Sequence, residues 1–437
     1  MHTVAFYTLG CKVNQYETEA MTELFSANGY RIVDFNIPAD IYIINTCTVT
    51  SMSDRKSRQI IRRAKKLNPD AYIAVAGCYA QTAPDTVLEI EGVNLVIGNN
   101  NRKNIVGLVE ENMHTPKHSA VGDIMNVRDF EELSISTYSE RTRAFIKVQE
   151  GCNQFCSYCI IPYARGPIRS RTPESIISEI KTLIKNGFTE VVLTGIHVAS
   201  YGKDLKNTDL AELILTVNEI EGIERIRLSS IEPMTLNTDF INRIAKADKL
   251  CRHFHLSLQS GCDETLKRMN RKYTTFEYKK IVDSLRENFP DVAITTDIMV
   301  GFPYETDEEF EKTLKFTKEI AFADAHIFQY SPRKGTRAAE MTEQIPPEIK
   351  EKRSKALIKL CEETRSNFLG GFLGKSYPVL FEQPTSDGYF EGKTDNYITV
   401  LVPSTENLSG KFCMVEFEYE KDGKIYGRLK GTVKKLG

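Results

Sequence analysis

Apolar residues in the first quarter of the chain come in short, nearly continuous runs that alternate with helical patterns. The runs VAFYTL, IYIINT, YIAVAG and NLVIG are separated by amphipathic stretches at residues 15–28, 51–67 and 83–90. Strands that are apolar throughout are buried on both faces, as in a parallel sheet with helices on each side. The pattern therefore predicts an α/β fold here, a compact Rossmann-like parallel domain of three layers over residues 1–115.

The periodicity is lost at residues 114–142, which carry little that could be buried and are expected to form a linker. Six further strand–helix units follow, with the strand candidates AFIKVQ, EVVLTG, RIRLSS, FHLSL, VAITTDIMVG and AHIFQYS. Helices are expected between them, such as 173–186 and 308–320, and a long one at 347–369. Six units are too few for an eight-fold barrel, so residues 138–369 are predicted to form a partial (βα)6 barrel.

A different period begins after Gly370 and Gly371. The runs YPVLFEQ, YFEGKT, YITVLVP, KFCMVEFEYE and IYGRLKGTV are short, rich in aromatic and β-branched residues, and separated by Gly, Asp-Gly or Pro. Such runs are typical of antiparallel strands joined by tight turns. Residues 372–437 are therefore predicted to form a small closed β barrel, of a kind that often binds oligonucleotides.

The composition of the 437-residue chain is that of an ordinary globular protein, with 41% hydrophobic and 27% charged residues. It has neither a signal-peptide pattern nor an apolar stretch approaching the roughly 18 residues that span a bilayer, so we expect a cytoplasmic protein. In that reducing compartment, ten cysteines favour metal binding or redox chemistry over disulfides. The net charge of −2 gives no global reason to bind nucleic acid, so any RNA contact must depend on local patches.

Three cysteines in the segment GCNQFCSYC, which follows the first strand of the second unit, have an ordered spacing: Cys152, Cys156 and Cys159. In one tight loop each thiolate can bind one iron of a cubane cluster, which leaves the fourth iron without a protein ligand. The amino and carboxylate groups of S-adenosylmethionine can occupy that iron, and one-electron reduction then yields a 5'-deoxyadenosyl radical. The alternatives are buried thiols or structural zinc, but zinc prefers four ligands in paired Cys-x2-Cys knuckles.

A second trio, Cys11, Cys47 and Cys78, is spread over the first domain at intervals of about one βαβ repeat. Each residue directly follows an apolar strand and precedes a helix, so all three are expected at one edge of the sheet, where such folds bind ligands. Three thiolates there can hold a second cluster with another open iron, although three buried thiols are the alternative. The remaining cysteines show no mutual spacing and are expected to be core or surface thiols: Cys251, Cys262, Cys361 and Cys413.

With both trios in view, the chain resembles the methylthiotransferases of the radical S-adenosylmethionine superfamily. The motifs TLGCKVNQYET, INTCTVT, VAGCYAQ, GCNQFCSYCIIPYARG, LSSIEP, HLSLQSGCDETLKRMNRKY and TDIMVGFPYET occur in the family's order. The terminal barrel resembles the RNA-binding TRAM module. The resemblance implies two 4Fe-4S clusters, S-adenosylmethionine, the anticodon stem-loop of tRNA as partner, and an electron donor such as flavodoxin or ferredoxin.

The family's subgroups differ in substrate: isopentenyladenosine in tRNA, threonylcarbamoyladenosine in tRNA, or an aspartate of a ribosomal protein. The segments CKVNQYET and YARGPIRSR look most like the threonylcarbamoyladenosine enzymes, whereas the other two groups usually show CQMN-type and CPKN-type first motifs. The implied reaction replaces the C2 hydrogen of the adenine just 3' of the anticodon by a methylthio group. It requires the two open irons to face one cavity. A non-catalytic iron-sulfur RNA-binding protein is the alternative of another class.

Candidate cofactor contacts follow from the same resemblance. Tyr158 lies between two cysteines, where the superfamily usually places an aromatic residue beside the adenine of S-adenosylmethionine. Other candidates lie at predicted strand ends, because the carboxyl rim of a (βα) barrel forms its site, with strand-end packing as the alternative: Gly195, Ser229, Ser230, Glu232, Gln259 and Gly301. The histidines near these ends are expected in core or rim roles rather than as ligands: His197, His253 and His255.

Candidate RNA contacts fall in two places. Helical spacing puts Arg55, Arg58, Arg62 and Lys65 on one stripe beside the Cys47 loop, which suits phosphates, although a solvated helix face explains it equally well. After the radical-site loop come Arg165, Arg169 and Arg171, whose planar guanidinium groups suit phosphates, bases or the carboxylate of a threonyl group. The terminal barrel has equal numbers of basic and acidic residues, so RNA binding there is implied by the resemblance alone.

Overall fold

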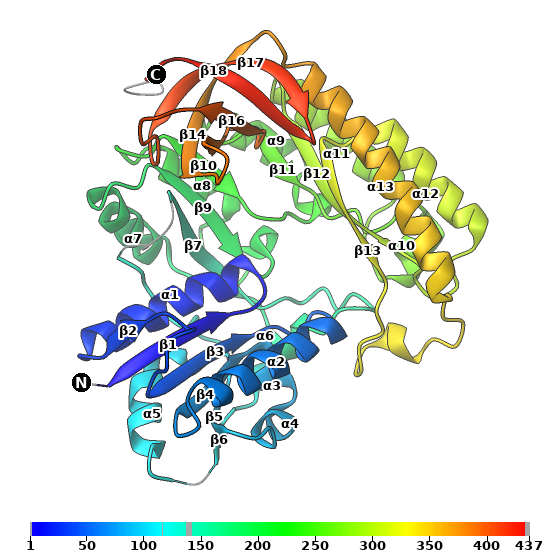
Figure 1. The fold of residues 1–437 in the computed structure, drawn as a ribbon. Helices are drawn as coiled ribbons and strands as arrows, with labels where there is room; N and C mark the ends of the chain where they lie inside the picture. The colour runs from blue at the N-terminus through cyan, green and yellow to red at the C-terminus, as the bar shows by residue number, and fades with distance from the viewer. Residues whose placement is uncertain (1, 116, 137–141, 433–437) are drawn as a thin grey trace.

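The computed structural model describes residues 2–115, 117–136 and 142–432, and it has three parts (Figure 1). An N-terminal α/β part lies at the bottom of Figure 1, an open barrel of strands and helices in the middle, and a small closed β barrel at the top. No helix among the described residues is long and apolar enough to cross a membrane. The exact domain boundaries given above stay predictions.

The N-terminal part is a parallel sheet, with helices on both faces, as predicted. Its described residues form six strands in the order β2-β1-β3-β4-β5-β6. The strands are β1 (Thr3–Thr8), β2 (Arg31–Val33), β3 (Ile41–Thr46), β4 (Tyr72–Gly77), β5 (Val93–Ile97) and β6 (His118–Ala120). The helices are α1 (Lys12–Ala27), α2 (Ser51–Leu67), α3 (Cys78–Thr82), α4 (Pro84–Leu88) and α5 (Ile105–Asn112).

The two faces of this sheet have separate apolar cores. Alternate side chains of a strand point to opposite faces. In β3, Ile41 and Ile43 accordingly pack with α1 and α5, whereas Tyr42 and Ile44 pack with α2 and α3. All six residues of β3 are buried. The short edge strands β2 and β6 were not predicted, because each has only three residues and neither is apolar throughout.

The central part is an open barrel. Between residues 142 and 370, six parallel strands follow one another in chain order, and isolated bridges connect the strand segments at β10 and β11. These strands are β7 (Arg143–Glu150), β9 (Glu190–Gly195), β10 (Arg225–Leu228), β11 (His253–His255), β12 (Ala293–Val300) and β13 (Asp324–Gln329), and the antiparallel β8 (Arg169–Ser170) lies beside β7. The prediction of a partial six-unit barrel is confirmed.

Helices cover the outside of this open barrel, with a shared apolar core between them and the strands. They are α7 (Pro173–Lys185), α8 (Leu210–Asn218), α9 (Thr238–Ile244), α10 (Asp263–Arg268), α11 (Thr275–Asn288), α12 (Asp307–Ile320) and α13 (Pro347–Gly370). The short helix α6 (Ile161–Arg165) lies instead beside α3, at the junction with the N-terminal part. Short 3-10 turns occur at Arg102–Asn104, Ile124–Asn126, Val198–Ser200, Pro233–Thr235 and Arg337–Glu340. Capping boxes begin α11 at Thr274 and α12 at Thr306, as expected for helices with Glu at their third position.

The C-terminal part is a closed barrel in the order β14-β15-β16-β18-β17, as predicted. Its strands are β14 (Ser376–Pro384), β15 (Tyr389–Lys393), β16 (Thr399–Pro403), β17 (Phe412–Lys421) and β18 (Lys424–Thr432). It packs on the amino ends of the central strands: Arg225, which opens β10, donates to the backbone oxygens of Lys393 (3.0 Å) and Pro378 (2.8 Å). The closed barrel therefore covers the floor of the open one.

The predicted linker is packed more tightly than expected. Ile124, Leu133 and Ile135 are buried, and the backbone oxygen of Leu133 accepts a hydrogen bond from the Tyr16 hydroxyl. The expectation that this segment has little to bury is wrong, because its few apolar residues are spaced irregularly and fill gaps between the two larger parts. Residues 137–141 of the predicted linker lie outside the described residues. The four cysteines without mutual spacing, which were expected to be core or surface thiols, are all buried.

Candidate active site

The first trio lies where the sequence predicted it, at the carboxyl ends of three adjacent strands. Cys11 follows β1, Cys47 follows β3 and Cys78 follows β4. Two glycines permit this close approach. Gly10 has φ +104° and its missing Cβ would lie 2.8 Å from the Cys47 Cβ, and Gly77 has φ +93° and would meet the Thr46 backbone oxygen at 2.3 Å. Burial, with smaller contributions from the other two thiols, raises the pKa of Cys78 to about 12.

The second trio occupies the loop after β7. Cys152 donates its backbone N–H to the Gly166 oxygen at 3.0 Å, and Cys159 donates to the Cys156 oxygen at 2.9 Å, so the loop is closed on itself. Gly151 has φ +75°, and a Cβ there would lie 1.8 Å from the Pro167 oxygen. Burial raises the pKa of Cys152 to about 11 and that of Cys159 to about 12, and in both cases the Cys156 thiol adds to the shift.

Each trio supplies three thiols, the number that a cubane cluster needs when its fourth iron stays open. Within the described residues, no three His, Cys, Asp or Glu side chains converge on a position that could hold a single metal ion. A cubane does not require this convergence, because each thiolate binds a different iron atom. In each trio the neighbouring thiols raise one another's pKa. A bound metal would favour the thiolate form, which burial disfavours. The arrangement suits a cluster better than a tetrahedral zinc site.

One arginine joins the two cysteine edges. Arg165 ends α6, directly after the radical-site loop, and its Nε donates to the Cys78 Sγ at 3.1 Å. Its Nη1 contacts Glu17 Oε1 at 2.6 Å and Glu150 Oε1 at 3.2 Å. Asn99 reinforces the same junction by donating to the Ala164 oxygen at 2.8 Å. The N-terminal sheet edge therefore lies against the loop side of the open barrel, as two facing clusters require.

Around Arg165 lies a buried network of charges that the sequence did not reveal. Arg102 Nη1 contacts Glu17 Oε1 at 2.5 Å, and Lys147 Nζ contacts Glu150 Oε2 at 3.0 Å. These side chains are at most 1% exposed. Burial alone would raise the pKa of Glu150, but Lys147, Arg165 and Arg102 hold it well below its ordinary value. The network binds α1 of the N-terminal part to β7 of the barrel.

The three arginines predicted to contact RNA lie in the protein interior and form no exposed basic patch, and their role toward the substrate stays a prediction. Arg165, Arg169 and Arg171 are at most 2% exposed, and their guanidinium groups contact other groups inside the protein. Arg171 pairs with Glu179 and, through its Nε, with Glu132 at 3.1 Å. Arg169 donates to the backbone oxygen of Arg165 at 2.9 Å. Sequence spacing correctly placed these groups near the loop, but Glu17 and Glu132, which pair with Arg165 and Arg171, lie far away along the chain, so the sequence pattern left these charges free for RNA.

The candidate cofactor residues share the rim that carries the radical-site loop. Gly195 ends β9, Ser229, Ser230 and Glu232 follow β10, Gln259 follows β11, and Gly301 follows β12. The ring of Tyr158 lies edge-on to Phe302, with centroids 6.4 Å apart. Their roles stay predictions. The sequence missed one further residue, Arg271, whose Nη1 donates to Cys156 Sγ at 3.4 Å while its Nη2 contacts Glu232 Oε2 at 2.8 Å.

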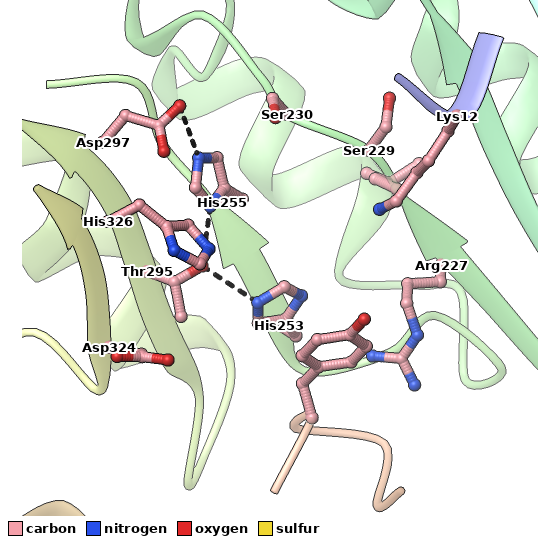
Figure 2. A pocket seen from close by; sticks show the side chains of 12 residues that line it. Lys12, Arg227, Ser229, Ser230, His253, His255, Thr295, Asp297, Asp324 and His326 are labelled. Atoms are coloured by element: carbon pink, nitrogen blue, oxygen red, sulfur yellow. Dashed lines mark hydrogen bonds and ion pairs between the residues drawn. The ribbon is translucent and has the colours of Figure 1, made fainter. Parts of the chain in front are cut away.

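Below this rim the open barrel encloses a cavity of about 320 Å³ (Figure 2). All three parts of the chain contribute to its wall. It is lined by Lys12, Arg227, Leu228, Ser229, Ser230, His253, His255, Thr295, Asp297, Asp324, His326 and Tyr397. Of these, the sequence analysis named only Ser229, Ser230, His253 and His255. The other residues become neighbours only when the chain folds.

The basic residues of α2 are partly exposed, and one of them bonds to another residue of the N-terminal part. Arg55 and Arg62 are exposed, whereas Arg58 donates to the Tyr79 hydroxyl at 3.2 Å. Ile60 and Ile61 are buried against the sheet. A role of this stripe in binding RNA phosphates stays a prediction.

The fold and the cysteine loop define a class, the radical S-adenosylmethionine enzymes, and comparisons with known proteins agree. The family model of the Radical SAM superfamily matches residues 146–317, and that of Uncharacterized protein family UPF0004 matches residues 3–98. Among solved structures, the radical S-adenosylmethionine methyltransferase TsrM from Kitasatospora setae has a similar fold, with a TM-score of 0.59 and 15% identity. That similarity covers 78% of this chain and 75% of TsrM.

Three curated relatives narrow this class. The threonylcarbamoyladenosine tRNA methylthiotransferase MtaB of Bacillus subtilis is 43% identical, over 95% of this chain and 94% of its own length. MtaB of Aquifex aeolicus is 40% identical, with coverages of 90% and 97%. The tRNA-2-methylthio-N(6)-dimethylallyladenosine synthase of Clostridium botulinum is also 40% identical, with coverages of 86% and 85%. The chain belongs to the tRNA methylthiotransferase family.

Proposed function

We propose that this chain transfers a methylthio group to C2 of the adenine in threonylcarbamoyladenosine, at the nucleotide beside the anticodon of tRNA. The two MtaB relatives, which match nearly end to end, support this substrate. The observation that carries the proposal is the contact of Arg165 with Cys78, because it brings the two cysteine edges to one junction. Two clusters that act on one base require such a junction.

Cys152, Cys156 and Cys159 would hold one 4Fe-4S cluster, and Cys11, Cys47 and Cys78 the other. With S-adenosylmethionine bound, the first cluster supplies one-electron chemistry that generates a carbon radical. Acid–base side chains could not replace it, because the C2 hydrogen of adenine is neither acidic nor open to nucleophilic displacement at neutral pH. The chain's own task is therefore to position the base and exclude competing reactants.

Several residues of the chain suit that task. Arg271 contacts both Cys156 and Glu232, so it fixes the radical-site loop against the strand end proposed to contact S-adenosylmethionine. The charges around Arg165 are themselves buried at the junction of the two cysteine edges. Hydrogen bonds to cluster sulfurs also tune reduction potentials, which gives Arg165 and Arg271 an electronic role besides a structural one.

The remaining partners are also proposals. Arg55 and Arg62 on α2 suit the phosphates of the anticodon stem-loop, and the closed C-terminal barrel suits RNA by its fold. A small redox protein such as flavodoxin or ferredoxin would supply the electron. Because tRNA is modified in the cytoplasm, we place the protein there.

Mass spectrometry of tRNA nucleosides from a strain without this gene tests the proposal. We expect 2-methylthio-threonylcarbamoyladenosine to disappear and its unmethylthiolated precursor to accumulate. When the intact gene is restored, the product should reappear and the precursor should fall. Loss of the methylthiolated isopentenyl nucleoside instead would assign the chain to that second substrate. Unchanged tRNA nucleosides would contradict a tRNA substrate and direct the search to ribosomal proteins.

A further inference from the structure

The cavity in the open barrel extends from the candidate cofactor contacts to the floor. Ser229 and Ser230 lie at its rim, where β10 ends (Figure 2). Tyr397 of the closed barrel lines the floor beside Arg227. The Tyr397 ring stacks on His253 with centroids 4.6 Å apart, and the Arg227 guanidinium lies 4.7 Å from its centre. Tyr397 has φ +70°, a conformation that bulky residues rarely adopt, so this floor is a specifically built feature.

Lys12 is the basic group in this cavity whose charge has no counterpart. Arg227 contacts Glu190 Oε1 at 2.9 Å and donates to two backbone oxygens of the closed barrel, so its charge is already used. Lys12 has no hydrogen-bond or ion-pair partner anywhere in residues 2–115, 117–136 and 142–432. Figure 2 shows the ammonium pointing into the cavity.

The opposite wall offers polar groups of another kind. Asp297 and Asp324 are there, and His255 Nε2 contacts Asp297 Oδ2 at 3.3 Å. On the rim side, the Ser229 hydroxyl is buried and has no hydrogen-bond partner among the described residues. Buried polar atoms normally have partners, so an unpaired hydroxyl that lines a cavity indicates a polar ligand. The cavity is therefore cationic on one wall and rich in acceptors on the other.

We propose that this cavity binds the threonylcarbamoyl side chain of the modified adenine, with Lys12 contacting its carboxylate. The assignment rests on the proposed function. That side chain carries one carboxylate, one hydroxyl and ureido N–H groups, so the anion matches Lys12 and the donors match the aspartate wall. The apolar dimethylallyl group would leave the Lys12 ammonium desolvated without a partner and would offer no donors to Asp297 and Asp324, and a site built for polar groups rejects a ligand that lacks them. With the side chain below the rim, the adenine lies beside the cofactor contacts.

Two synthetic anticodon stem-loops test this assignment, one carrying threonylcarbamoyladenosine and the other its methyl ester, which differ in one negative charge. Binding to the anaerobically reconstituted full chain is measured by fluorescence anisotropy without S-adenosylmethionine, and kcat/KM for methylthiolation is measured separately. We expect the wild-type protein to bind the acid about 10-fold to 100-fold more tightly than the ester, the range for a charge-assisted hydrogen bond. Lys12→Met should lose this preference by weakening only the acid, and Lys12→Arg should restore much of it.

Lys181→Met on the exposed face of α7 is the matched control and should keep the preference. Equal binding of acid and ester by the wild-type protein would overturn the assignment without any variant. It would also be overturned if Lys12→Met, with normal iron content, kept the preference or weakened both RNAs alike. If the wild-type protein methylthiolates neither RNA but accepts one carrying dimethylallyladenosine, the proposed function itself fails, which is a different result.

Discussion

Replacing Arg165 by methionine tests whether the buried charge network holds the two cysteine edges together. Arg165 is fully buried, and its guanidinium contacts Cys78, Glu17 and Glu150. Removing one partner of a buried ion pair costs about 3–5 kcal/mol, because the remaining charge stays buried without compensation. Arg102 and Lys147 still contact the same carboxylates, so we expect the lower end of that range, about 3 kcal/mol.

This cost should depend on pH in a defined direction. Burial alone would raise the pKa values of Glu17 and Glu150, but the surrounding cations hold both below the ordinary value. Such carboxylates add stability above their unfolded pKa, and this stability is lost as the pH falls through the folded pKa. Arg165→Met raises both folded pKa values. The destabilisation should therefore be full near pH 7 and should shrink as the pH falls below about 4.

Hydrogen exchange with mass spectrometry on the reconstituted protein is the appropriate assay, because it resolves local opening of α1 and α6 in a chain of several domains. The matched control is Arg243→Met. Arg243 contacts Asp209 at 2.6 Å but is 30% exposed, and exposed ion pairs contribute about 0–1 kcal/mol. The reasoning is refuted if α1 and α6 exchange equally slowly in both variants, or if the difference between them stays constant down to pH 3.

Three further predictions concern the clusters and the RNA. Cys156→Ala should abolish reductive cleavage of S-adenosylmethionine, whereas Cys47→Ala should retain it and block methylthiolation; equal loss of cleavage, read by 5'-deoxyadenosine release, would contradict separate roles. Gly151→Ala should lower the iron content, because the added Cβ would overlap a backbone oxygen. The control Gly187→Ala, at φ +91° with nothing within 4 Å, should keep the iron content. Similar iron content in both variants would contradict the steric argument. Arg62→Glu should weaken tRNA binding and reduce the slope of log affinity against log salt by about 0.7–0.9; an unchanged slope would leave α2 as a plain solvated face.

Local information in the sequence was sufficient for the fold. Hydrophobic periods of two and of 3.6 residues are set by neighbours along the chain, so they located all six central strands and five strands of the C-terminal barrel. The position of the first trio also followed, because residues that come after adjacent parallel strands must meet at one edge of a sheet. Edge strands of three residues, such as β2, are too short to show such a pattern and were missed.

The sequence by itself determined which cysteines gather and on which edge, because strand order and side-chain alternation fix those positions. Only the tertiary structure decided which charges are free. Arg165 looked available for RNA but pairs with Glu17, whereas Lys12, unremarkable in the sequence, has no hydrogen-bond or ion-pair partner among the described residues. The reason is physical: the energy of a charge depends on burial and on neighbours in space, and those neighbours are contributed by segments far apart along the chain.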